Sequence, residues 1–110
     1  MRPIRLAAAG GELCAALLLA RAGVTAQPPV QTIVIVSMAF SPANVTVKPG
    51  QTIEWVNKDL FEHTATADDH GFDLDLKPGA KAHISAPRSG IISYSCRFHP
   101  GMKGVIRVQP

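Results

Sequence analysis

Short runs of alternating apolar and polar residues fill the chain from Val30 onward, and Pro, Gly and Asn interrupt them. Alternation with a period of two is typical of β-strands that turn one face to a core, and no stretch has the periodicity of a helix. The pattern predicts eight strands, at residues 30–38, 44–48, 51–57, 63–67, 72–76, 80–85, 90–96 and 103–109. Eight short strands in a chain of this length predict an all-β fold, a two-sheet β-sandwich.

One phase of each alternation gives the residues expected to point inward. They are Ile33, Ile35, Phe40, Val45, Val47, Ile53, Trp55, Leu74, Ile84, Ile92, Tyr94, Ile106 and Val108. Pro followed by Gly occurs at residues 48–51, 77–80 and 99–102, an order that favours type II turns between strands.

Residues 1–26 have the pattern of a cleaved export signal. Arg2 and Arg5 give the segment a basic start, apolar runs follow at 6–9 and 13–20, and the segment ends in the small residue Ala26. The longest apolar run is far shorter than the roughly 20 residues needed to cross a bilayer. The polar break at residues 10–12 is unusual for a signal peptide, which leaves an N-terminal amphipathic or membrane-anchoring helix as the alternative.

Removal of this leader leaves one domain, residues 27–110, and changes both the charge and the cysteine count. The leader holds three of the 11 Lys and Arg residues and one of the 8 Asp and Glu residues, so the net charge falls from +3 to +1. A nearly neutral domain without a basic run gives no support for nucleic-acid binding. Cys96 is then the sole cysteine of an exported protein, and such a residue is a free thiol, half of an intermolecular bridge or a metal ligand.

Side chains that could bind a metal or react are concentrated at the end of the predicted strand at 90–96 and in the segment that follows it. Cys96, His99 and Met102 place a thiol, an imidazole and a thioether at every third position, and a turn through Pro100 brings them toward one point. His63, at the start of an earlier strand, is the best candidate for a fourth donor. One thiolate, two imidazoles and a weak thioether form the ligand set of electron-transfer copper, whereas zinc sites do not use a thioether.

This ligand pattern resembles that of the cupredoxins, the small blue copper proteins, and within them the short-loop amicyanin-like and plastocyanin-like members. The spacing Cys96-x-x-His99-x-x-Met102 is similar to the amicyanin ligand loop, and residues 40–57 resemble the strand pair before the first histidine ligand. The resemblance covers nearly all of residues 30–109. It departs from the amicyanin pattern at Phe98, where those proteins usually have proline.

The resemblance implies a Greek-key β-sandwich that binds one copper ion in a type 1 site through His63, Cys96, His99 and Met102. It also implies that His99 is the partly exposed ligand through which electrons leave, and that the Thr64 backbone N–H donates to the Cys96 sulfur. A rigid site without an open coordination position suits a redox shuttle and not an enzyme.

We therefore expect a monomeric periplasmic protein of a bacterium that carries single electrons between an unidentified redox donor and acceptor, without stable membrane insertion. A copper chaperone or copper-sequestering protein that uses the same ligands is the alternative. A third reading, a nucleophilic enzyme in which His99 activates Cys96, lacks an evident acyl pocket. Each candidate ligand could also have an ordinary structural role, for example Met102 as a core side chain. All four residues would then have to show the spacing of a copper site by coincidence.

Overall fold

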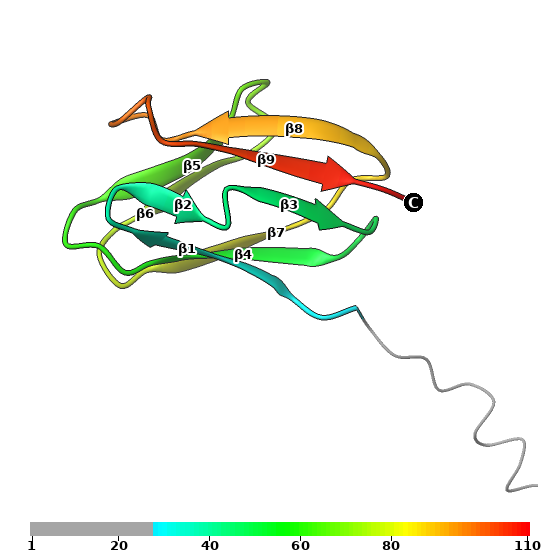
Figure 1. Cartoon of the computed structure of the whole chain (residues 1–110), viewed down its shortest axis with the longest axis horizontal. Helices are drawn as coiled ribbons and strands as arrows, with labels where there is room; N and C mark the ends of the chain where they lie inside the picture. The colour runs from blue at the N-terminus through cyan, green and yellow to red at the C-terminus, as the bar shows by residue number, and fades with distance from the viewer. Residues whose placement is uncertain (1–27) are drawn as a thin grey trace, which may run out of the picture.

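The computed structural model describes residues 28–110, so the predicted signal peptide and its cleavage site lie outside the described residues. This part of the chain is all-β and forms two facing sheets, as predicted (Figure 1). The strands are β1 (Gln31–Val36), β2 (Ala39–Ser41), β3 (Asn44–Val47), β4 (Thr52–Asn57), β5 (His63–Ala67), β6 (Asp73–Leu76), β7 (Lys81–Ser85), β8 (Gly90–Ser95) and β9 (Lys103–Val108). No helix in this range is long and apolar enough to span a membrane.

One sheet has the strand order β2-β1-β4-β7 and the other the order β3-β9-β8-β5-β6. Both contain a parallel pair, β1 with β4 and β3 with β9, and the remaining neighbours are antiparallel. Because β5 and β8 are neighbours in the second sheet, the two segments that carry the candidate ligands lie side by side. The fold therefore joins sequence positions about thirty residues apart.

The structure has nine strands where the sequence predicted eight, because the short strand β2 follows the first predicted strand, in a segment where no strand was predicted. A tight turn at Ser37 and Met38, with φ of 52° and 60°, separates β1 from β2. Two positive φ angles are typical of a type I′ hairpin turn, which favours Asn and Gly. Neither residue type is present here, so the sequence did not indicate the turn.

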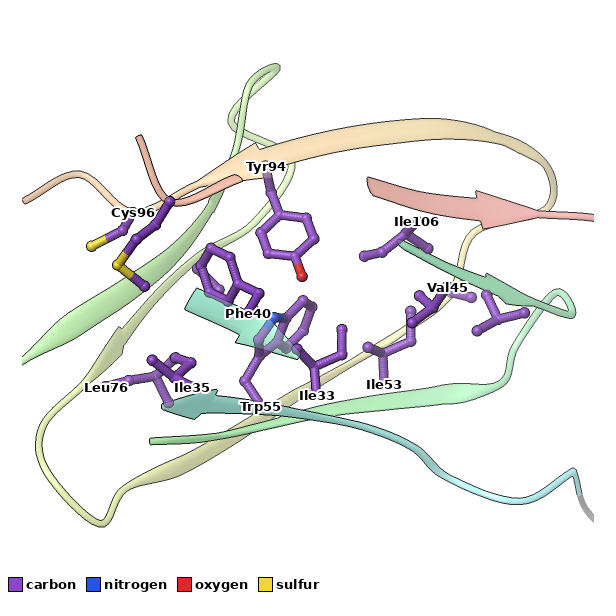
Figure 2. Packing of buried hydrophobic residues seen from close by; sticks show 14 of the residues in the cluster. Ile33, Ile35, Phe40, Val45, Ile53, Trp55, Leu76, Tyr94, Cys96 and Ile106 are labelled. Carbon is purple, nitrogen blue, oxygen red and sulfur yellow. The ribbon is translucent and has the colours of Figure 1, made fainter. Parts of the chain in front are cut away.

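The predicted core is largely correct. Ten of the thirteen residues expected to point inward are buried, and Leu74, Ile84 and Ile92 are partly buried against them. Phe40, Trp55 and Tyr94 form an edge-on aromatic group, with Tyr94 centred 4.7 Å from Phe40 and 5.4 Å from Trp55. Figure 2 shows this group in the middle of the core and the Cys96 sulfur at one end of it.

Two connections leave the sandwich at the same end, opposite the C-terminus (Figure 1). The β4–β5 connection leads to His63, and the β8–β9 connection contains residues 96–102. At the other turns, Gly50 and Gly79 have φ of 78° and 81° and close i to i+3 hydrogen bonds, which confirms the two type II turns predicted there.

Candidate metal centre

His63 and Cys96 are brought together by the pairing of β5 with β8. His63 is the first residue of β5, and Cys96 follows the last residue of β8, which pairs with Thr66. Both side chains are fully buried. The distance from the Cys96 Sγ to the His63 Nδ1 is 3.9 Å.

His99 reaches the same point through a closed turn. The Met102 N–H donates to the His99 carbonyl at 2.8 Å, and the Cys96 N–H donates to the Met102 carbonyl at 3.2 Å. Gly101 does not have a positive φ, so the type II turn predicted here is wrong although the turn itself forms. The His99 Nδ1 lies 3.8 Å from the Cys96 Sγ.

The two imidazoles and the thiol form a compact donor group. The ligand atoms of His63, Cys96 and His99 all lie within 4.8 Å of one another. Met102 is also buried, in the same core cluster as Cys96, and its backbone closes the loop. The structure thus brings three of the four predicted donors to one point and places the fourth in the adjoining core. Met102 as a ligand stays a prediction.

The three donor residues differ in how far their side chains are exposed to solvent. His63 and Cys96 are 0% exposed, whereas His99 is only half-buried. The ring centroids of the two imidazoles are 5.2 Å apart. Among these three donors, His99 is therefore the one that connects the buried thiol with the surface.

The Cys96 sulfur accepts a hydrogen bond from the Thr64 backbone N–H at 3.3 Å, as the resemblance implied. Such a bond stabilises negative charge on the sulfur and tunes a bound metal. The Phe98 N–H makes no hydrogen bond to this sulfur within the described residues. The Phe98 ring is half-exposed, and the Arg97 guanidinium lies 5.5 Å from its centroid.

Asp59 is a residue that the sequence analysis missed. Its Oδ2 lies 2.9 Å from the His63 Nε2, and its carboxylate also accepts the N–H groups of Ser37 and Met38. The Met38 N–H lowers the pKa of Asp59 below the ordinary 3.8, and the bonds from His63 and Ser37 act in the same direction. A carboxylate on Nε2 holds the proton there, so Nδ1 is free to bind a metal.

Asn57, which is fully buried, fixes the loop that carries Asp59. Its Nδ2 donates to the Phe61 and Leu76 carbonyls, each at 2.8 Å, and its Oδ1 accepts the Asp59 N–H at 2.9 Å. The last residue of β4 thereby ties the β4–β5 connection to β6. The orientation of His63 thus depends on buried hydrogen bonds outside the donor group.

The donor set fits copper. Neutral Nδ1 atoms suit Cu(II), a thiolate suits Cu(I), and the aligned N–H of Thr64 supports the thiolate charge. Structural zinc takes four strong N or S ligands, whereas only three such donors meet at this point among residues 28–110. The residues present therefore match a single copper ion.

Comparison with known proteins agrees with this fold and site. A model of the cupredoxin-like domain family matches residues 11–108, so the chain belongs to this family. The match begins within the predicted leader, and the boundary at Ala26 stays a prediction. Plastocyanin from Scenedesmus fuscus is 32% identical over 87 residues, which cover 66% of this chain and 89% of the plastocyanin.

Two solved structures extend the comparison. The reduced state of an amicyanin variant is 26% identical, with a TM-score of 0.67, and the alignment covers 80% of this chain and 88% of the amicyanin. A copper-containing nitrite reductase from Thermus scotoductus SA-01 is 31% identical, with a TM-score of 0.70. That alignment covers 80% of this chain and 24% of the reductase, so this chain spans about a quarter of the enzyme.

Proposed function

We propose that this cupredoxin is a type 1 copper protein that carries single electrons, with His63, Cys96, His99 and Met102 as its ligands. The observation that carries the proposal is the meeting of two imidazole nitrogens and one buried thiol within 4.8 Å. The amicyanin-like spacing to Met102, which lies in the adjoining core, supports a weak fourth ligand.

Copper supplies a one-electron couple, and the protein supplies a site that barely rearranges. Asp59 fixes the His63 imidazole, and Thr64 holds the Cys96 sulfur. The turn that joins His99 to Met102 is closed by a backbone hydrogen bond. Held in this way, the donors would keep one geometry in both oxidation states of a bound copper ion, which would favour fast electron transfer.

His99 is the proposed exit for electrons, and exposed apolar residues are close to both histidines in the sequence. Phe98 directly precedes His99, and Leu60 and Phe61 lie just before His63. Their exposed fractions are 49%, 89% and 62%. Apolar side chains beside a half-buried ligand suit a short-lived contact with a redox protein.

Export to a bacterial periplasm, with the protein acting there as a monomer, is part of this proposal. It is supported by the pattern of residues 1–26 and by the single cysteine of residues 27–110. The identities of the electron donor and acceptor are not part of it.

Burial of the donors favours a carrier over the other functions that the sequence suggested. A chaperone must present its ligands to an acceptor, and a nucleophile must meet its substrate. Cys96 and His63 are both fully buried in the described structure.

Voltammetry of the copper-loaded protein tests the proposal. We expect a reversible one-electron wave and full retention of copper when a Cu(I) chelator is present during cycling. The wave should vanish in Cys96→Ser and persist in His83→Ala, which removes an exposed histidine on β7. Transfer of the metal to the chelator without a reversible wave would instead support a chaperone.

A further inference from the structure

Two threonines of β5 are buried on the face opposite the core. Side chains alternate along a strand, so Thr64 and Thr66 point away from the side occupied by His63 and Ala65. Thr64 is nonetheless 0% exposed and Thr66 only 6% exposed. Their hydroxyl groups meet the Asp73 side chain from β6 and the Arg97 backbone N–H from the ligand loop, two residues that lie more than twenty positions apart in the sequence.

These hydroxyl groups form a one-way chain of hydrogen bonds that ends on a carboxylate. The Thr66 hydroxyl donates to the Asp73 Oδ1 at 2.7 Å, so its oxygen is left to accept from Thr64, 2.9 Å away. The Thr64 hydroxyl proton is then used in the bond to Thr66, and the Thr64 hydroxyl oxygen accepts a hydrogen bond from the Arg97 backbone N–H at 2.8 Å. The Asp73 carboxylate thereby sets the orientation of both hydroxyl groups, and the Thr64 oxygen is left to accept from the residue after Cys96.

The Arg97 side chain closes the chain into a ring. Its Nε donates to the same Asp73 Oδ1 at 3.0 Å, and its Nη2 donates to Asp75. The Thr66 hydroxyl and then Arg97 lower the pKa of Asp73 below 3.8, so the carboxylate is charged at neutral pH. Arg97 is therefore held at two places, by its backbone on β5 and by its guanidinium on β6.

We propose that Asp73 and the Arg97 side chain are a positioning pair for the copper ligand loop, acting through Thr66 and Thr64 on the backbone at Cys96. The proposal rests on the proposed function, because it assigns these residues to the same site. The Asp73 side chain is 49% exposed, so a carboxylate at the surface fixes the position of the loop that carries the buried Cys96 sulfur.

Asp75 provides a matched control. It lies on the same strand, carries the same charge and also pairs with Arg97, but it makes no hydrogen bond to Thr66 within the described residues. Asp73→Ala and Asp75→Ala each remove one partner of Arg97, and only Asp73→Ala interrupts the chain of hydrogen bonds. Thr66→Val cuts the chain while both carboxylates remain.

Amide hydrogen exchange of the copper-free protein is the first readout. Interruption of the hydrogen-bond chain should speed exchange at the Arg97 N–H roughly five- to tenfold in Asp73→Ala and in Thr66→Val, because one hydrogen bond is weakened. Asp75→Ala should stay within about twofold of the wild type. Equal effects of the two aspartate variants, or no effect of Thr66→Val, would overturn the proposal.

The second readout is the copper hyperfine splitting in the electron paramagnetic resonance spectrum of the Cu(II) form. It should change in Asp73→Ala and Thr66→Val and match the wild type in Asp75→Ala. A wild-type spectrum without a copper–thiolate signature would overturn the proposed function, and the exchange data would still decide whether the chain holds the loop. Unchanged splitting in both chain-cutting variants of a blue protein would overturn the positioning role alone.

Discussion

The His63 Nε2 lies 2.9 Å from the Oδ2 atom of Asp59, and the two oxygens of this carboxylate also accept backbone N–H groups from the β1–β2 turn. A single side chain thus connects a buried ligand with a hairpin on the facing sheet. Hydrogen bonds of this kind fix the orientation and tautomer of a metal-binding imidazole.

Asp59→Asn should weaken Cu(II) binding about 10- to 100-fold and raise the reduction potential. The neutral amide no longer supports the charge of the oxidised site and accepts a weaker hydrogen bond from His63. Competition titration and voltammetry measure the two effects. Glu62→Gln is the control, because it removes the same charge from an exposed side chain next to His63. Equal shifts in both variants would show that charge alone, and not the contact, matters.

Met38→Gly should stabilise the protein by about 0.5–1 kcal/mol. Met38 has φ of 60° in the β1–β2 turn, a conformation that glycine adopts without strain, and its N–H bond to Asp59 is kept. Urea unfolding of the copper-free protein measures the change. A loss of stability would mean that the Met38 side chain contributes more than the strain that its backbone costs.

Gly104→Ala should destabilise the protein by about 1–3 kcal/mol or more, because a Cβ at this position would lie 2.3 Å from the Tyr94 ring. Gly104 pairs with Tyr94 across β8 and β9, so the glycine makes room for the ring. Gly101→Ala is the control, since a Cβ there meets nothing within 4 Å. Similar unfolding midpoints for the two variants would contradict the packing described here.

Stability should fall between pH 10 and pH 12 because of Tyr94. Burial raises the pKa of Tyr94 from 10.0 to about 12. The folded state therefore favours the neutral phenol, whose contribution is complete below pH 10 and is lost as the pH rises toward 12. Two pKa units correspond to about 2–3 kcal/mol.

Urea unfolding of the copper-free protein at pH 9 and pH 12 measures this loss, and Tyr94→Phe should lose less stability over the same interval. At pH 7 the substitution should cost about 1 kcal/mol or less, because the hydroxyl has no hydrogen-bond partner within the described residues. An identical pH dependence in both proteins would contradict a buried phenol at this position.

The sequence predicted the parts of this structure that depend on local pattern. Period-two alternation located the strands and most of the core, and the spacing of Cys96, His99 and Met102 indicated the ligand loop. The choice of His63 depended on the strand order and on the cupredoxin resemblance, and the structure places it beside Cys96. Local pattern succeeds where a face of a strand or a short turn decides the position of a side chain.

The features that the sequence did not predict depend on contacts between distant segments. The β1–β2 turn lacks Asn and Gly and is held by Asp59, more than twenty residues away. Alternation places Thr64 and Thr66 on an outer face, and only the fold shows that Arg97 and β6 cover them. These contacts carry no sequence signature of their own.

The visible spectrum of the protein spanning residues 27–110 with one equivalent of Cu(II) tests the central claim most directly. The proposed ligand set predicts an intense thiolate-to-copper charge-transfer band that saturates at one copper per chain and disappears in Cys96→Ser. A colourless or only weakly absorbing complex, or a band that survives the loss of Cys96, would contradict the assignment of a type 1 copper site.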